Sequence, residues 1–280
     1  MDWSDEPEPT PALQPLTPQS GPTPPQRLTV QYLFVWITAT SILLALYMAG
    51  PGRPSEQQFT VLVLVNLIRF IASVLYGASL ASWYLVAKQR WDKEAKFPAL
   101  AGHWLCLVLS LREVVLLITG IGALAIGEAF VKNSFGAAAT VLSFIPAIAA
   151  LPAIGGWAFS LLSTTMPLGW KVYAGLRIGA EICVVTAILA GMGGFLARQG
   201  DGAALIMFYP VLQMAAWGCG LGAFVAAFVM LIIDLTSKRK YDWLHWLGVA
   251  TALAAPLLGT LLWFGAMAGA ISSLTREAPF

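Results

Sequence analysis

The chain has 280 residues, of which 58% are hydrophobic and 11% are charged, and its formal net charge is +2. Soluble globular domains carry about 25% charged residues, so this composition excludes that class and predicts a polytopic protein surrounded by membrane lipids. The length accommodates about seven spans of roughly 20 residues and no separate soluble domain, and the small net charge gives no indication of nucleic acid as a partner.

We therefore expect an all-α bundle of about seven transmembrane helices, with the N-terminus in the cytoplasm and the C-terminus outside. Residues 1–27 are acidic and rich in Pro, contain few large apolar side chains, and are predicted to form a disordered tail. Residues 28–271 are predicted to form the transmembrane helical domain. Residues 272–280 follow it as a short C-terminal tail.

The first predicted span covers residues 28–49 and opens with the sequence TVQYLFVWIT at residues 29–38. This opening resembles the first helices of uncharacterised bacterial multi-pass membrane proteins that begin after a Pro-rich tail. The resemblance covers the tail and one helix. It implies the bacterial inner membrane as the location and implies no activity.

The second predicted span, residues 60–87, carries a polar stripe that includes Asn66 and Arg69. The polar and small residues of this span recur at spacings of three, four and seven, which places them on one face of a helix. The loop that follows, residues 88–98, is rich in Lys and Arg, and residues 238–240 form a second basic loop. Because basic loops beside membrane spans stay in the cytoplasm, the two loops predict the orientation given above.

The third predicted span runs from Trp104 to Gly127 and carries Arg112 and Glu113 near its middle. A charged residue at the centre of a spanning helix costs roughly 2.5 to 3.5 kcal/mol, so both side chains are expected to face protein or water. Small residues at helical spacing share the charged face, which favours contact with another helix there.

The fourth apolar region, residues 134–162, is interrupted by Pro146, by Pro152 and by two adjacent glycines. It can form one kinked span or two half-helices that meet inside the membrane, an arrangement known from transporters. We expect the single kinked span, because Pro is well tolerated in spanning helices.

The last three predicted spans, residues 172–197, 203–233 and 243–271, are rich in small residues. In the first of them, Arg177 and Glu181 are spaced for an ion pair between adjacent helical turns. Glycines spaced four residues apart are expected to let helix backbones approach each other. These pairs are Gly175 with Gly179, Gly218 with Gly222, and Gly265 with Gly269. They leave the oligomeric state open.

The charged stripes of three spans are expected to meet in one interior cluster, in which three positive charges outnumber two negative ones. The cluster comprises Arg69, Arg112, Glu113, Arg177 and Glu181, with Asn66 beside it. Ionisable groups inside a membrane are functional by default, and an excess of Arg suits a small anionic ligand or an anionic lipid headgroup. Binding or passage of such a ligand is the leading functional hypothesis.

Two other functions remain open. The ion pairs can simply fix helix packing, which would make the chain a non-catalytic membrane subunit or scaffold. A membrane-embedded lipid-modifying enzyme is the third alternative, with Glu113 or Glu181 as acid or base. No catalytic motif, cofactor motif or metal-binding motif supports an enzyme, so we expect no catalytic residues, no cofactor and no metal.

The tripeptide His-Trp-Leu occurs twice, beginning at His103 and at His245. Two histidines at one depth can hold a haem or a metal ion. We instead interpret both tripeptides as parts of the interfacial belt, with the polar ends of His and Trp in contact with water.

Overall fold

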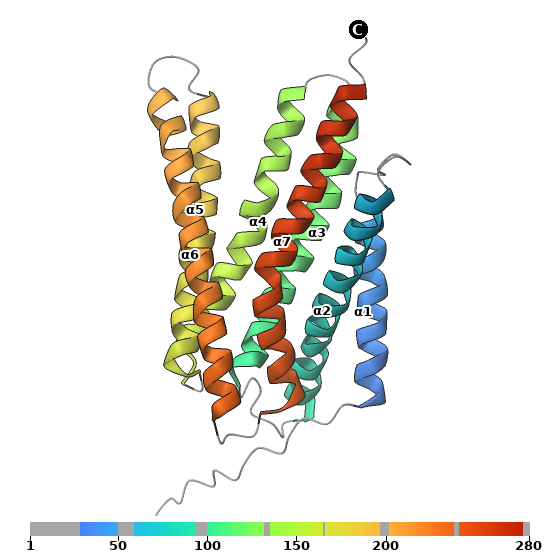
Figure 1. The fold of residues 1–280 in the computed structure, drawn as a ribbon, viewed down its shortest axis with the longest axis vertical. Coiled ribbons are helices and arrows are strands. Elements are labelled where there is room, and N and C mark those ends of the chain that lie inside the picture. Colours follow the sequence, from blue (N-terminus) through green and yellow to red (C-terminus); the bar gives the residue numbers. More distant parts are fainter. Residues whose placement is uncertain are drawn as a thin grey trace, which may run out of the picture.

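The computed structural model describes residues 29–49, 59–92, 100–131, 135–164, 166–196, 202–237 and 241–276. All regular structure within these ranges is helical, and the helices lie roughly along one axis (Figure 1). They are α1 (Val30–Ala49), α2 (Phe59–Asp92), α3 (Ala101–Val131), α4 (Phe135–Leu162), α5 (Leu168–Leu196), α6 (Gly202–Thr236) and α7 (Trp243–Arg276). In the described part of the chain, six helices are long and apolar enough to cross a membrane, and α7 contains a shorter apolar stretch.

This architecture confirms the expected all-helical, multi-pass class. The region around the interior prolines forms one continuous helix, α4, which contains both Pro146 and Pro152. The expected single span is therefore confirmed over Phe135–Leu162, and two separate half-helices are excluded there. The helix α7 continues to Arg276, beyond the expected end at residue 271. The expected tail at residues 1–27 lies outside the described residues.

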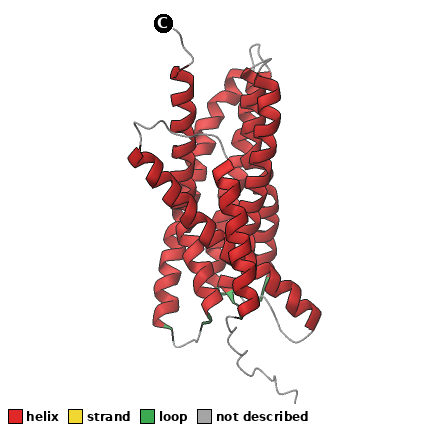
Figure 2. Cartoon of the chain, turned by 90° about the vertical axis from the view of Figure 1, so that its right-hand side faces the viewer, coloured by secondary structure: helices red, strands yellow, loops and turns green. Residues whose placement is uncertain are grey.

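Neighbours in sequence are mostly neighbours in space. At one side of the bundle α5 packs against α6, at the other α1 packs against α2, and α4 joins α3 to α5. The helix α7 lies against both α2 and α3 (Figure 1). The view turned by 90° shows the same elongated arrangement (Figure 2). We call the end where α6 ends and α7 begins the base of the bundle.

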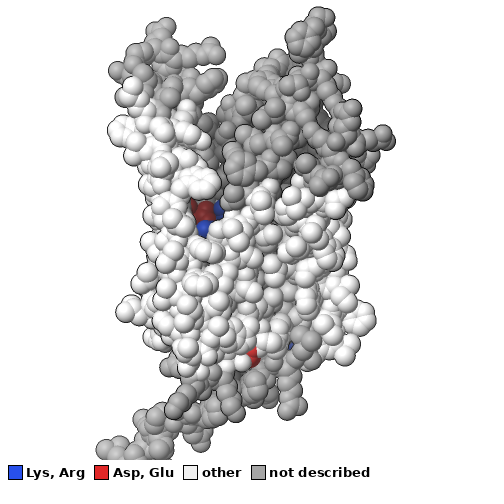
Figure 3. Space-filling model, viewed as in Figure 1, with Lys and Arg blue, Asp and Glu red and all other residues white. Residues whose placement is uncertain are grey.

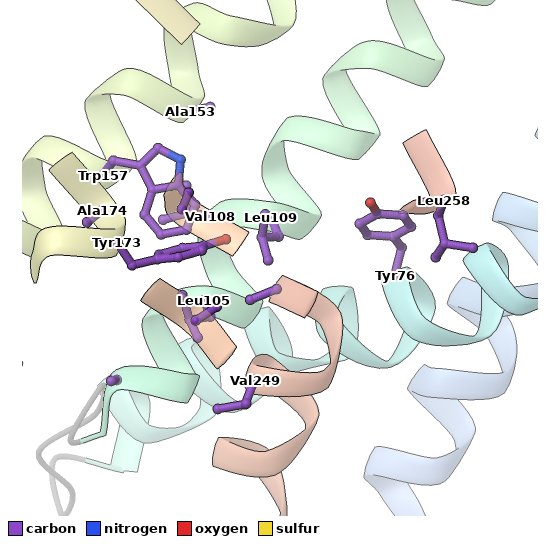
Figure 4. Close-up of a cluster of buried hydrophobic side chains, with 14 of the residues drawn as sticks. Tyr76, Leu105, Val108, Leu109, Ala153, Trp157, Tyr173, Ala174, Val249 and Leu258 are labelled. Carbon is purple, nitrogen blue, oxygen red and sulfur yellow. The ribbon is translucent and has the colours of Figure 1, made fainter. Parts of the chain in front are cut away.

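Bulky side chains from α3, α4 and α5 meet in a buried hydrophobic cluster (Figure 4). The rings of Trp157 and Tyr173 meet edge to face, with their centroids 5.5 Å apart, close to Val108 and Leu105. Trp157 is completely buried and Tyr173 is 1% exposed. Between helices in a membrane, side chains of this size stabilise the fold through close van der Waals packing.

A tight helix crossing joins α3 to α7 at Gly102 and Gly248. A Cβ atom added at Gly248 would lie 2.7 Å from the carbonyl carbon of Gly102, closer than real Cβ contacts come. A side chain at Gly102 would in turn collide with the backbone of His245. Both positions therefore need glycine, because only a missing side chain lets the two backbones approach this closely.

The two described glycine pairs that the sequence spacing indicated do not form a helix contact as close as that between Gly102 and Gly248. Gly179 and Gly222 do line the α5–α6 contact, since a Cβ at these positions would lie 3.4 Å from Cys219 Sγ and 3.5 Å from Leu176 Cδ1, respectively. Gly175 and Gly218 have no neighbour within 4 Å of an added Cβ, so the expected close approach is wrong there. The third expected pair, at residues 265 and 269, lies outside the residues whose surroundings are described.

Replacing Gly248 with Ala is therefore expected to destabilise the bundle by about 1 to 3 kcal/mol, the usual cost of overpacking a tight contact. Thermal unfolding of the purified protein in detergent measures this loss. Gly175→Ala is the matched control, because its methyl group meets open space and helix propensity favours Ala over Gly. Equal melting temperatures for the two variants would contradict the close crossing.

Candidate functional site

The centre of the bundle contains an ion-pair cluster that joins α3 to α5. Arg112 Nε lies 2.7 Å from Glu181 Oε1, and Arg177 Nη2 lies 2.9 Å from the same oxygen. Arg177 and Glu181 face each other because they are four residues apart on α5. We call Arg112, Arg177 and Glu181 the arginine–glutamate cluster. Its two positive charges share one carboxylate, so it carries a formal charge of +1.

The cluster opens onto the side of the bundle. The side chain of Arg112 is 26% exposed and that of Arg177 is 13% exposed, whereas Glu181 is 2% exposed. Figure 3 shows blue and red atoms together on the floor of a hollow at mid-height. Arg112 lies about 16 Å along α3 from its first residue, at 1.5 Å per residue, which is about a third of the length of this helix. The guanidinium groups are therefore within reach of a ligand from outside the protein.

Glu113 forms no ion pair with this cluster, although its charge lies close enough to act on Arg112. Its Oε1 accepts a hydrogen bond from the hydroxyl group of Tyr47 on α1, and the residue is 5% exposed. Since Glu113 directly follows Arg112, helical geometry turns the two side chains about 100° apart. Arg112 thus faces α5, while Glu113 ties α3 to α1.

Arg69 and Asn66 also lie apart from the cluster. Within the described residues Arg69 forms no ion pair with either glutamate, and its side chain is half-buried on α2. The Oδ1 atom of Asn66, one turn away, is buried and has no hydrogen-bond partner among the described groups. The expected five-residue cluster is therefore divided in the structure: Arg112, Arg177 and Glu181 meet, and Arg69 and Glu113 lie elsewhere.

The arginine–glutamate cluster retains unused hydrogen-bonding capacity. A guanidinium group has five N–H donors, and one nitrogen of each arginine contacts Glu181. Arg177 Nε and Glu181 Oε2 are buried without a hydrogen-bond partner in the described part of the chain. Forked N–H donors match the oxygens of a carboxylate or phosphate, so the cluster can bind such a group beside Glu181.

A second polar group lies at the base of the bundle. It consists of His103, Trp170, Asp234, Tyr241, Asp242 and His245, which we call the base network. Asp234 accepts three hydrogen bonds, from Trp170 Nε1 at 3.1 Å, Tyr241 Oη at 2.7 Å and His245 Nε2 at 3.0 Å. This one carboxylate therefore connects α5, α6 and the start of α7.

Asp242 fixes the start of α7 and links it to α3. Its Oδ1 accepts the backbone N–H of His245 at 2.9 Å, as an N-cap does, and His103 Nε2 lies 3.0 Å from Oδ2. Burial works toward a higher pKa for Asp242, but the hydrogen bond and charge of His103 outweigh it and lower the pKa below its ordinary value. The lowered pKa stabilises the fold above about pH 3.9, and this stability is lost as the pH falls through the folded value.

The base network corrects our interpretation of the two His-Trp-Leu tripeptides. His103 is 2% exposed and His245 is 1% exposed, so the expectation that their polar ends contact water is wrong. Within the described residues, no group of three or more His, Cys, Asp or Glu side chains is arranged to hold a metal ion. Sequence reasoning also missed Asp234 and Asp242. The one available signal was Asp242 just before an apolar run, the position of an N-cap.

The fold, the arginine–glutamate cluster and the base network together define an all-helical, multi-pass membrane protein with a charged cluster in its interior. No protein family, curated protein or solved structure matches the chain.

Proposed function

We propose that the arginine–glutamate cluster binds a small anionic group, a phosphate or carboxylate, from a solute or from a lipid headgroup. The observation that carries the proposal is the shared Glu181 oxygen, which leaves the cluster with a formal charge of +1 and unused N–H donors. An anion would complete the charge balance. Hydrogen bonds between charged groups contribute about 1.5 to 3 kcal/mol each, enough for specific binding.

The position of the cluster favours access from the side. Arg112 is partly exposed on the flank of a bundle whose exterior is apolar, and lipid tails cannot solvate a guanidinium group. An anionic headgroup in the hollow would satisfy Arg112 while its chains remain among the lipids. The proposed location is the bacterial inner membrane, with the base of the bundle facing the cytoplasm, because both basic loops lie next to helix ends at the base.

The test measures the affinity of the protein, in nanodiscs of zwitterionic lipid, for two probes: inorganic phosphate and dodecyl phosphate. We expect Arg112→Ala to weaken binding about tenfold or more, since it removes charged hydrogen bonds. Arg112→Lys keeps the positive charge and loses the forked N–H donors of the guanidinium group. Its affinity for the probe should therefore lie between those of wild type and Arg112→Ala. Arg69→Ala is the matched control and should leave binding within about twofold, because Arg69 lies outside the cluster.

Each arm of this experiment has a distinct meaning. Binding of dodecyl phosphate alone identifies a lipid headgroup as the ligand, and equal binding of both probes identifies the free anion. An affinity that is the same in wild type and Arg112→Ala, or no binding to the folded wild type, would refute the proposal.

One observation favours a second function, that of a structural membrane subunit. Arg112 on α3 and Arg177 on α5 converge on a single oxygen of Glu181, and the contact from Arg112 fixes α5 against α3 without any ligand. On this account Arg112→Ala should lose folded protein, and neither probe should bind to wild type. Breaking a buried ion pair costs about 3 to 5 kcal/mol, so the loss would be readily measured.

A further inference from the structure

His245 is held in one tautomer by its hydrogen bonds. The backbone N–H of Gly102, at the start of α3, donates to His245 Nδ1 over 3.1 Å. A nitrogen that accepts a hydrogen bond carries no proton, so the proton of the neutral ring lies on Nε2 and points to Asp234 Oδ2 at 3.0 Å. Because His245 is 1% exposed, water does not reach either contact.

The ring has little room to move. Tyr241 stacks on it at a centroid distance of 4.2 Å, and Trp170 meets it edge-on at 6.5 Å. The backbone of His245 lies against Gly102 at the tight crossing of α3 and α7, so main-chain movement is restricted as well. Because the ring cannot turn away, protonation of Nδ1 must alter its hydrogen bond to the Gly102 N–H on α3.

We infer that His245 is an acid-sensitive latch, in which the neutral imidazole accepts the Gly102 N–H at the start of α3 and protonation at Nδ1 breaks this one hydrogen bond, while His103 and Asp242 still join the two helices. A protonated Nδ1 would point its own N–H at the N–H of Gly102, and two donors cannot form a hydrogen bond. The Nε2–H bond to Asp234 persists in either state. Protonation thus converts a bridge among α3, α6 and α7 into an ion pair between α6 and α7 alone.

The charged and titratable groups around His245 indicate that protonation of this ring, and not of a neighbour, breaks the contact with Gly102. Asp234 on α6 faces Nε2, and Asp242 accepts its backbone N–H. Burial, the largest influence, and His103 on α3 favour the neutral ring, and together they outweigh the two carboxylates, which favour the protonated ring. Asp242 stays ionised above about pH 3.9, and protonated His103 would only strengthen its pairing with Asp242. Loss of the α3 contact between pH 8 and 5 therefore points to His245.

This latch is independent of anion binding, because its residues lie at the base and not in the arginine–glutamate cluster.

Imidazole nitrogen NMR shifts of the isotope-labelled full chain in lipid bilayers test the latch. The chain has 2 histidines, so His103→Gln leaves His245 as the only signal. At pH 8 we expect an unprotonated Nδ1 and a protonated Nε2. As the pH falls to 5, Nδ1 should become protonated and the Gly102 amide should exchange about fivefold faster or more, after correction for intrinsic exchange.

His245→Asn provides the matched comparison, because the Asn oxygen can accept the Gly102 N–H and does not titrate. In this variant the corrected exchange of Gly102 should be independent of pH. The opposite tautomer at pH 8, no protonation of Nδ1 by pH 5, or protonation that leaves Gly102 exchange unchanged would each overturn the inference. Should His103→Gln not fold, the difference between wild-type and His245→Asn spectra isolates the same ring.

Discussion

Replacing Asp234 with Ala is expected to lower the free energy of unfolding by about 3 kcal/mol, among the largest effects of any single substitution in this chain. Trp170, Tyr241 and His245 all donate to this carboxylate. A buried donor left unpaired costs about 1 to 3 kcal/mol, and Trp170 and His245 are both almost fully buried. Tyr241 is only half-buried, so its hydroxyl can turn to another partner.

The unfavourable position of Asp234 in the helix dipole of α6 reduces this loss in the free energy of unfolding. Asp234 lies in the last turn of α6, where a negative charge is unfavourable by about 0.3 to 1 kcal/mol, so the predicted value is already reduced. Reversible unfolding in mixed detergent micelles measures the change. Thr236→Ala, on the same turn, is the control: its exposed hydroxyl bonds only carbonyls of its own helix, and we expect a change within about 0.5 kcal/mol. Similar losses for both variants would contradict the role of Asp234.

Glu181→Gln is expected to change both stability and ligand binding. The substitution conserves volume and one carbonyl oxygen but removes the charge that Arg112 and Arg177 share. Unbalancing a buried pair costs about 3 to 5 kcal/mol, and the partial exposure of Arg112 places this case at the lower end. Anion binding should instead tighten about tenfold, because a neighbouring negative charge has been removed.

A thermal shift with and without dodecyl phosphate measures both effects. The melting temperature of Glu181→Gln should be low without the probe and should rise further than that of wild type when the probe is added. Glu113→Gln is the matched comparison, since that carboxyl group bonds Tyr47 and acts on Arg112 only through its charge, so we expect a smaller change than for Glu181→Gln. A destabilised Glu181→Gln protein that the probe fails to rescue would indicate a purely structural ion pair.

The helices could be predicted from the sequence because each one is an apolar run, and clusters of basic residues mark two of the six connections between them. The pairing of Arg177 with Glu181 was equally accessible, since both residues lie on adjacent turns of one helix. What periodicity cannot supply is the rotation of one helix against another. For this reason Glu113 was expected beside the arginines, although it faces Tyr47 on α1.

The base network was missed for a related reason. Its members come from four helices, and Gly102 and His245 meet across 143 positions of sequence. A lone histidine next to Trp is typical of the membrane interface, and that local pattern outweighed a partner that only the tertiary structure reveals. The same limit applies to glycine, where equal spacing gave a tight contact at Gly179 and open space at Gly175.

The central claim, that the arginine–glutamate cluster holds an anion, is tested most directly by native mass spectrometry. The wild-type protein, purified in detergent, is compared with Arg112→Ala, Arg177→Ala and the control Glu113→Gln. We predict a defined anionic adduct on wild type and on Glu113→Gln that both arginine variants lack. A bare mass for folded wild-type protein, or an adduct that persists in both arginine variants, would contradict the claim.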